Sequence, residues 1–107
     1  MKVVEYLDPA GHSPFEAWFR RIEARAAVKV TVALARLEAG NLSNAKSVGG
    51  GVLEYRVDYG PGYRVYFGRD GNALILLLAG GTKQRQQRDI EGAHARWLDY
   101  KRRRRGD

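Results

Sequence analysis

The segment from Val52 to Lys83 constrains the fold more than any other part of the chain, because it reads as three consecutive strands. Residues 51–60 and 61–71 alternate apolar and polar side chains on either side of a Gly-Pro-Gly turn, which is typical of a half-buried β-hairpin. Residues 73–79 are continuously apolar, as expected for a strand covered on both faces. The pattern predicts a meandering antiparallel sheet with residues 73–79 in its centre.

The alternation also predicts how the hairpin strands pair. Apolar residues face apolar residues when Tyr55 lies opposite Val65, and this register places Arg56 opposite Arg64. Like charges directly across a ladder destabilise it by roughly 0.2–1 kcal/mol. The hairpin therefore carries two arginines in an arrangement that an anion would stabilise.

Two interpretations of these arginines remain open. In the first, Glu54 and Asp58 on the same face neutralise both arginines in a solvated network of salt bridges. Replacement of either arginine with Ala then costs less than about 1 kcal/mol of stability. In the second, Arg56 and Arg64 bind phosphate, and the same replacement leaves stability unchanged or raises it while function falls.

Helices are expected on both sides of the strand-rich segment in sequence. Residues 3–7 read as an opening strand, and Ser13-Pro14-Phe15-Glu16 forms a capping box at the start of a first helix. A second helix is predicted over residues 26–39, followed by a loop over residues 41–51.

A last helix is predicted after Thr82, with a basic polar side. Its expected apolar stripe consists of Ile90, Ala93, Trp97 and Leu98. The fold class is therefore α+β, with two N-terminal helices and a C-terminal helix packed on one face of a small antiparallel sheet.

Size and composition limit the function classes. A chain of 107 residues forms one domain, which we assign to residues 1–101 with a basic C-terminal tail at 102–107. The net charge is +7, but Lys101 to Arg105 and Asp107 together contribute +4 of it, so the remaining hundred residues carry +3. The absence of cysteine and of any long apolar run predicts a cytoplasmic protein with no disulfide and no membrane segment.

The residue types available for chemistry favour an RNA substrate. The two histidines, His12 and His94, lack the spacing of metal ligands, and no nucleophile or phosphate-loop motif is present. Metal-free RNA cleavage needs cations to stabilise the phosphorane and groups that move protons. The candidate residues are Arg56, Arg64, Tyr66, Lys83, Arg85 and Arg88, with Glu54 or His94 as a proton carrier.

Several of these residues belong to a pattern that resembles the RelE/ParE toxin superfamily. The matching runs are Glu54-Tyr55-Arg56, Gly62-Tyr63-Arg64, Gly80-Gly81-Thr82-Lys83 and Gln87-Arg88-Asp89-Ile90. The sequence is most similar to the phage-derived Gp49 or HigB-like branch, whose members are termed addiction module killer proteins. Tyr55 and Thr82 depart from the leucine and aspartate that are usual in this branch.

The resemblance implies a toxin of a type II toxin–antitoxin pair. Its expected activity is metal-independent, ribosome-dependent mRNA cleavage without a cofactor, silenced by a helix-turn-helix antitoxin of the HigA kind. The implied catalytic residues are Arg56, Arg64 and Lys83, while Tyr66, Arg85 and Arg88 are expected to bind RNA. The superfamily also contains DNA gyrase inhibitors, and a non-toxic binding module of the same fold is a third alternative.

Overall fold

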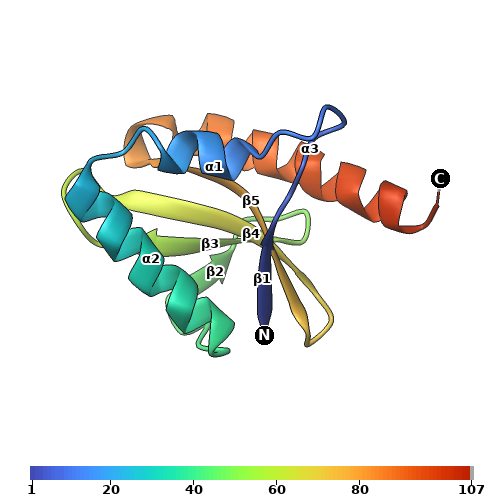
Figure 1. Cartoon of the computed structure of the whole chain (residues 1–107), viewed down its shortest axis with the longest axis horizontal. Coiled ribbons are helices and arrows are strands. Elements are labelled where there is room, and N and C mark those ends of the chain that lie inside the picture. The colour runs from blue at the N-terminus through green and yellow to red at the C-terminus, as the bar shows by residue number, and fades with distance from the viewer. Residues whose placement is uncertain (107) are drawn as a thin grey trace.

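A five-stranded mixed sheet with three α-helices makes up this α+β protein (Figure 1). The computed structural model describes residues 1–106. In chain order the elements are β1 (Lys2–Glu5), α1 (Pro14–Phe19), α2 (Ala24–Glu38), β2 (Ala45–Ser47), β3 (Val52–Val57), β4 (Tyr63–Asp70), β5 (Leu74–Thr82), the 3₁₀ helix η1 (Lys83–Arg85) and α3 (Gln86–Arg104).

The strands are ordered β1-β5-β4-β3-β2 across the sheet. Strands β2 to β5 pair antiparallel, whereas β1 pairs parallel with β5. The expectation of a purely antiparallel sheet is therefore wrong for its first strand. The expected loop at residues 41–51 also contains the short edge strand β2, which pairs with β3.

The hairpin register is the predicted one, with Tyr55 opposite Val65 and Arg56 opposite Arg64. Between β4 and β5 the register shifts after Tyr66, which lies opposite Ala79 while Phe67 lies opposite Leu77. This bulge leaves Leu78 as an extra residue in β5.

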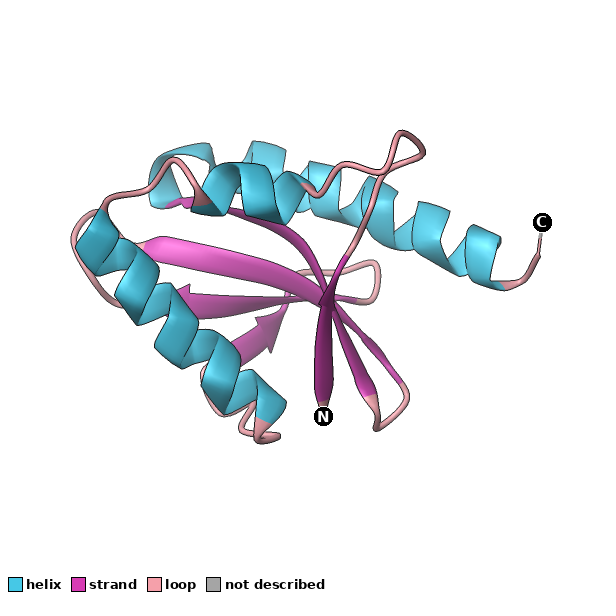
Figure 2. Cartoon of the chain, in the orientation of Figure 1, coloured by secondary structure: helices cyan, strands magenta, loops and turns pink. Residues whose placement is uncertain are grey.

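Helices cover both faces of the sheet, which corrects the expectation that all of them pack on one face (Figure 2). Alternate residues of β5 show the two layers: Ile75 and Leu77 pack with α1 and α2, whereas Leu76 and Leu78 pack with α3. Residues 75–79 are all buried because both faces of β5 are covered, as their continuous apolar run predicts.

The capping box predicted for α1 is present in part, since Ser13 Oγ accepts a hydrogen bond of 3.0 Å from the Glu16 amide. Thr82 precedes η1 rather than capping α3, and its side chain makes no capping hydrogen bond. The stripe predicted on α3 buries Ala93 and Trp97, but Leu98 is 53% exposed. Leu98 follows Trp97 directly, so it points about 100° away from it around the helix.

The basic residues predicted as a tail continue α3 through Arg104. Arg103 donates hydrogen bonds to Asp99 and to the Leu7 carbonyl, and Arg104 forms an ion pair of 2.8 Å with Asp70. The first three residues of the predicted tail are thus helical and two of them are bonded to the domain, while Asp107 lies outside the described residues.

Candidate functional site

Three of the sequence motifs meet at one end of the sheet. Arg56 lies near the end of β3 and opposite Arg64, which lies at the start of β4. Arg64 in turn lies opposite Gly81, two residues before Lys83. The Lys83 amide donates to the Gly62 carbonyl at 3.3 Å, which attaches η1 to the β3–β4 turn. Three neighbouring strands therefore bring together residues that are up to 27 positions apart in the sequence.

The two opposed arginines differ in their surroundings. Arg56 is exposed, whereas Arg64 is only 4% exposed. Arg64 Nε lies 3.6 Å from Glu54 Oε2, and the Glu54 side chain is fully buried. The network of salt bridges considered from the sequence is therefore formed at Glu54 and Arg64, but it is buried rather than solvated.

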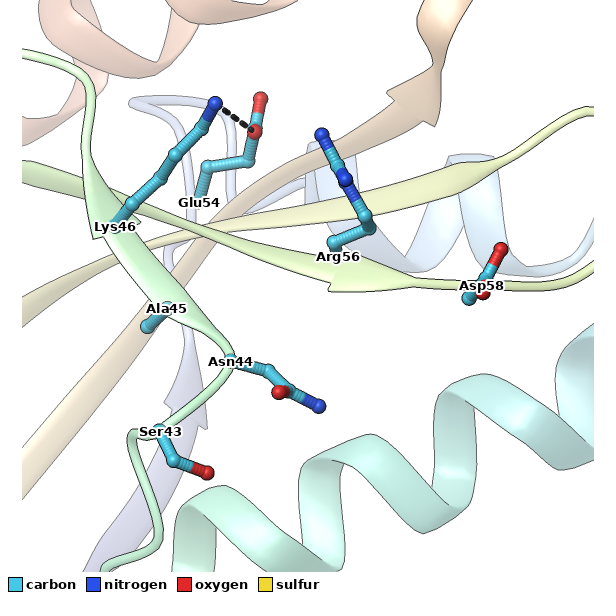
Figure 3. A pocket seen from close by; sticks show the side chains of 7 residues that line it. All are labelled: Ser43, Asn44, Ala45, Lys46, Glu54, Arg56 and Asp58. Atoms are coloured by element: carbon cyan, nitrogen blue, oxygen red, sulfur yellow. Dashed lines mark ion pairs between the residues drawn. The ribbon is translucent and has the colours of Figure 1, made fainter.

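Glu54 is held from two further directions. Gln86 Nε2, in the first turn of α3, donates a hydrogen bond of 2.8 Å to Glu54 Oε2. Lys46 Nζ, on β2, lies 3.9 Å from Glu54 Oε1 and is largely exposed (Figure 3). Glu54 thus connects β2, β4 and α3 through one carboxylate.

Tyr66 belongs to the same buried cluster, because it lies opposite Glu54 in the β3–β4 ladder. Burial raises the pKa of the Tyr66 hydroxyl, and the nearby Glu54 carboxylate raises it further. The ring is completely buried. The RNA contact expected of Tyr66 does not fit this position, because a base cannot reach the ring.

Asp89 on α3 packs against the β5 side of this buried cluster. It packs directly on Gly81, where any side chain would overlap its carboxylate. Burial raises the pKa of Asp89, and the charges of Arg85, Arg96 and Arg88 oppose this shift. The absence of a side chain at Gly81 is what allows α3 to bring Asp89 this close to the sheet.

Several buried polar atoms of this cluster have no hydrogen-bond partner within residues 1–106. They are Glu54 Oε1, Arg64 Nε, Arg64 Nη1, Tyr66 Oη and Asp89 Oδ2. Unsatisfied buried polar groups cost free energy, and where they cluster they mark strain or a functional site. Part of their cover is the first turn of α3, whose Gln86 bonds to Glu54 and whose Asp89 packs on Gly81.

Exposed cations surround this buried cluster. Lys83 and Arg85 are exposed on η1, and Arg88 is exposed on α3. On the other side of Glu54, a hollow of about 580 Å³ lies along β2 and β3. Arg56 and Lys46 line this hollow together with Asp58 (Figure 3). The expected site residues therefore form two groups, with Arg64 and Tyr66 buried and Arg56, Lys83, Arg85 and Arg88 exposed.

His94, which the sequence offered as a proton carrier, lies on α3 and lines a second hollow, of about 670 Å³, together with Lys83, Lys46 and Gln86. Its Nε2 is 3.0 Å from the Val48 carbonyl, and its ring packs against Gly50. This contact attaches the β2–β3 loop to α3. Sequence reasoning did not identify Lys46, Gln86 or Asp89 as site residues. Only Asp89 gave a signal, because it belongs to the run Gln87-Arg88-Asp89-Ile90.

Comparison with known proteins shows what this chain is similar to. No family model matches the chain. The chain is 40% identical over 80 residues to a protein of Haemophilus influenzae (strain ATCC 51907 / DSM 11121 / KW20 / Rd) that is described as uncharacterized. The alignment covers 74% of this chain and 81% of the relative. The chain belongs to the same family as this H. influenzae protein.

Proposed function

We propose that this protein is the toxin of a type II toxin–antitoxin pair, of the RelE/ParE superfamily and its HigB-like branch, and that it stops translation by cleaving mRNA. The observation that carries the proposal is the meeting of three motif segments at one end of β3, β4 and β5. This end presents exposed cations to a polyanion, as an RNA-binding surface requires.

In the proposed reaction, the RNA 2′-hydroxyl loses its proton to a base and attacks the adjacent phosphate to form a 2′,3′-cyclic phosphate, and the 5′-oxygen of the next nucleotide leaves as it takes up a proton. Arg56 and Lys83 are exposed cations of the motif segments, and we assign them to the negative charge that develops on the phosphorane. Arg85 and Arg88 contact the RNA backbone on either side of the scissile phosphate. This assignment keeps Arg56 and Lys83 from the sequence analysis as catalytic residues.

Arg64 receives a different role in the proposal. Because it is buried against Glu54, it positions the strand end that carries Arg56 instead of touching the substrate. Tyr66 likewise supports the site from within. A substrate contact for either residue would require the first turn of α3 to move away.

The proposed partners are mRNA, the ribosome and a HigA-like antitoxin of helix-turn-helix type. An antitoxin with acidic side chains would neutralise the exposed cations and associate quickly with them. The proposed compartment is the cytoplasm. Among the described helices, none is both long and apolar enough to cross a membrane.

A second candidate is favoured by the burial of Arg64 and Tyr66, which removes two expected site residues from solvent. The chain would then be a gyrase-inhibiting toxin or a binding module without ribonuclease activity, which share the fold without the chemistry.

Induction of the chain without an antitoxin separates these functions. Pulse labelling and mapping of mRNA 5′ ends should show translation arrest and new cleavage ends, and Lys83→Ala should abolish both effects. Growth arrest with DNA damage signalling and continued protein synthesis would identify a gyrase inhibitor. Normal growth with soluble protein would leave only the binding module.

A further inference from the structure

The outer ridge of α2 is apolar. Ala24, Val28, Val32 and Ala35 follow one another at spacings of four, four and three residues, so they form a single stripe along the helix. All four residues are exposed, and Val28 and Val32 are 62% and 44% exposed. We call these four residues the α2 ridge.

The opposite side of α2 already forms the core. Val30, Ala33 and Leu37 are buried against the sheet, so α2 is apolar on two opposite sides. A helix on the surface of a protein normally carries polar residues on its outer side, whereas a helix that is apolar all round is usually covered. Valine is also a weaker helix former than glutamine or lysine. Within residues 1–106, neither Val28 nor Val32 is among the residues that form or pack against the two hydrophobic cores.

One flank of the ridge is basic. Arg25, Lys29 and Arg36 lie on the side of α2 that faces β3, next to Val28 and Val32 in the helical projection. Lys29, Val32 and Arg36 line a groove of about 260 Å³ between α2 and β3. Arg56 and Asp58 from the end of β3 also line this groove, and Asp58 is its one acidic residue.

We propose that the α2 ridge and its basic flank bind an amphipathic helix of a partner protein, with acidic residues along one side. The apolar side of the partner helix packs on Val28 and Val32, and its acidic residues face Lys29 and Arg36. Helices that bind in this way make contact through apolar residues at positions i, i+3 or i+4 and i+7, which is also the spacing of the α2 ridge.

The charges argue against the other occupants. In a twofold antiparallel pairing of α2 with a second copy, the basic flank meets itself, and each chain carries +7. RNA would use the cations but gain little from aliphatic side chains, because single-stranded RNA binds by stacking on aromatic rings. α2 packs on the face of the sheet opposite to the Glu54–Arg64 cluster, and Val28 and Val32 have no part in the proposed reaction, so the proposal does not depend on the proposed ribonuclease activity.

The test uses a labelled synthetic helix of about 20 residues, with leucine along one side and glutamate along the flank that would face Lys29 and Arg36. A matched peptide carries lysine at every glutamate position. Fluorescence anisotropy measures affinity for the full chain, and amide chemical shifts locate the bound peptide. We expect saturable binding of the glutamate peptide, shifts confined to α2 and the end of β3, and no saturable binding of the lysine peptide.

Two variants test the residues. Val28→Gln/Val32→Gln should weaken binding about tenfold or more by removing both apolar anchors. Its melting temperature should stay at or above that of the wild type, because glutamine is the better helix former at an exposed position. Leu98→Gln removes an exposed apolar side chain on α3 and should leave the affinity unchanged.

Three results would overturn the proposal. They are the absence of saturable binding by the glutamate peptide, equal affinity in the Val28→Gln/Val32→Gln variant, and shifts that map to Lys83–Arg88 instead of α2. Concentration-dependent dimerisation of the wild type that the same double variant abolishes would also overturn it, because the ridge would then bind a second copy. Displacement of the peptide by single-stranded RNA, with shifts in α2, would assign the flank to nucleic acid.

Discussion

Glu54 on β3 and Arg64 on β4 form an ion pair that is almost completely removed from solvent, with Glu54 Oε2 3.6 Å from Arg64 Nε. The two residues are diagonal neighbours in the hairpin, since Glu54 lies opposite Tyr66 and Arg64 lies opposite Arg56. The same hairpin thus presents one arginine to solvent and keeps its opposite neighbour in the interior. Because the two arginines carry the same charge but differ in burial, replacing each in turn tests what burial contributes to stability.

We expect Arg64→Met to lower the free energy of unfolding by about 3 kcal/mol, because it leaves the Glu54 carboxylate buried without its cation. Arg56→Met, one position across the ladder, should change it by less than about 0.5 kcal/mol. Chemical denaturation of both variants measures the difference. Equal decreases in the free energy of unfolding of the two variants would show that the burial of Arg64 does not contribute to stability.

This expectation replaces one that the sequence suggested. Replacement of Arg64 was expected either to leave stability unchanged or to cost less than about 1 kcal/mol, as for a solvated pair. The burial of Arg64 changes this expectation, because a buried charge without a partner lowers the free energy of unfolding far more than an exposed one. The original expectation still applies to Arg56.

For the proposed ribonuclease, Arg56→Ala and Lys83→Ala should each lower the cleavage rate by about 100-fold, as for loss of one group that stabilises transition-state charge. Their melting temperatures should stay within a few degrees of the wild type. Arg21→Ala removes the same charge from an exposed position outside the site and serves as the control. Full activity in Arg56→Ala and Lys83→Ala would refute their catalytic assignment.

Local patterns in the sequence predicted the hairpin well. Side-chain alternation fixes which residues share a face, and the Gly60–Gly62 turn limits the register, so the Tyr55–Val65 and Arg56–Arg64 pairs follow from nearby residues. The double burial of β5 was also readable, because its apolar run is continuous.

Long-range packing was not readable in the same way. The apolar stripe of α3 says that the helix is covered on one side, but not which face of the sheet covers it. The side chains of Arg64 and Tyr66 point to the face of the sheet that was expected to be exposed. They are buried because α3 packs on that face. The parallel pairing of β1 with β5 joins residues more than 70 positions apart, which no local pattern encodes.

The raised pKa of Asp89 predicts a pH effect. For an acid whose pKa is higher in the folded state, stability falls as pH rises from the unfolded value through the folded value, because the buried carboxylate becomes charged. Asp89→Asn keeps the shape without the charge, so it should be more stable than the wild type at pH 7. The two proteins should converge as the pH falls below 3.8, the ordinary pKa of aspartate.

Thermal melts from pH 3 to 8 measure this effect. The difference in melting temperature between wild type and variant at each pH removes the contributions of other carboxylates, which both proteins share. Asp99, whose pKa is lowered chiefly by the hydrogen bond from Tyr6, contributes with the opposite sign in both proteins. A variant less stable than the wild type at pH 7 would show that the attraction of Arg85, Arg88 and Arg96 outweighs the burial of Asp89.

Arg102 and Arg103 are neighbours at the end of α3 that carry the same charge but differ in their contacts with the rest of the protein. Arg103 bonds to Asp99 and to the Leu7 carbonyl and lies 5.2 Å from the centre of the Tyr6 ring, whereas Arg102 is exposed. Arg103→Gln should lower the melting temperature, and Arg102→Gln should leave it unchanged. If this end of α3 only attracts RNA without specificity, both variants should weaken binding and reduce the slope of log affinity against log salt by about one, with cleavage positions unchanged. A shift of cleavage position in Arg102→Gln would place the helix end within the site.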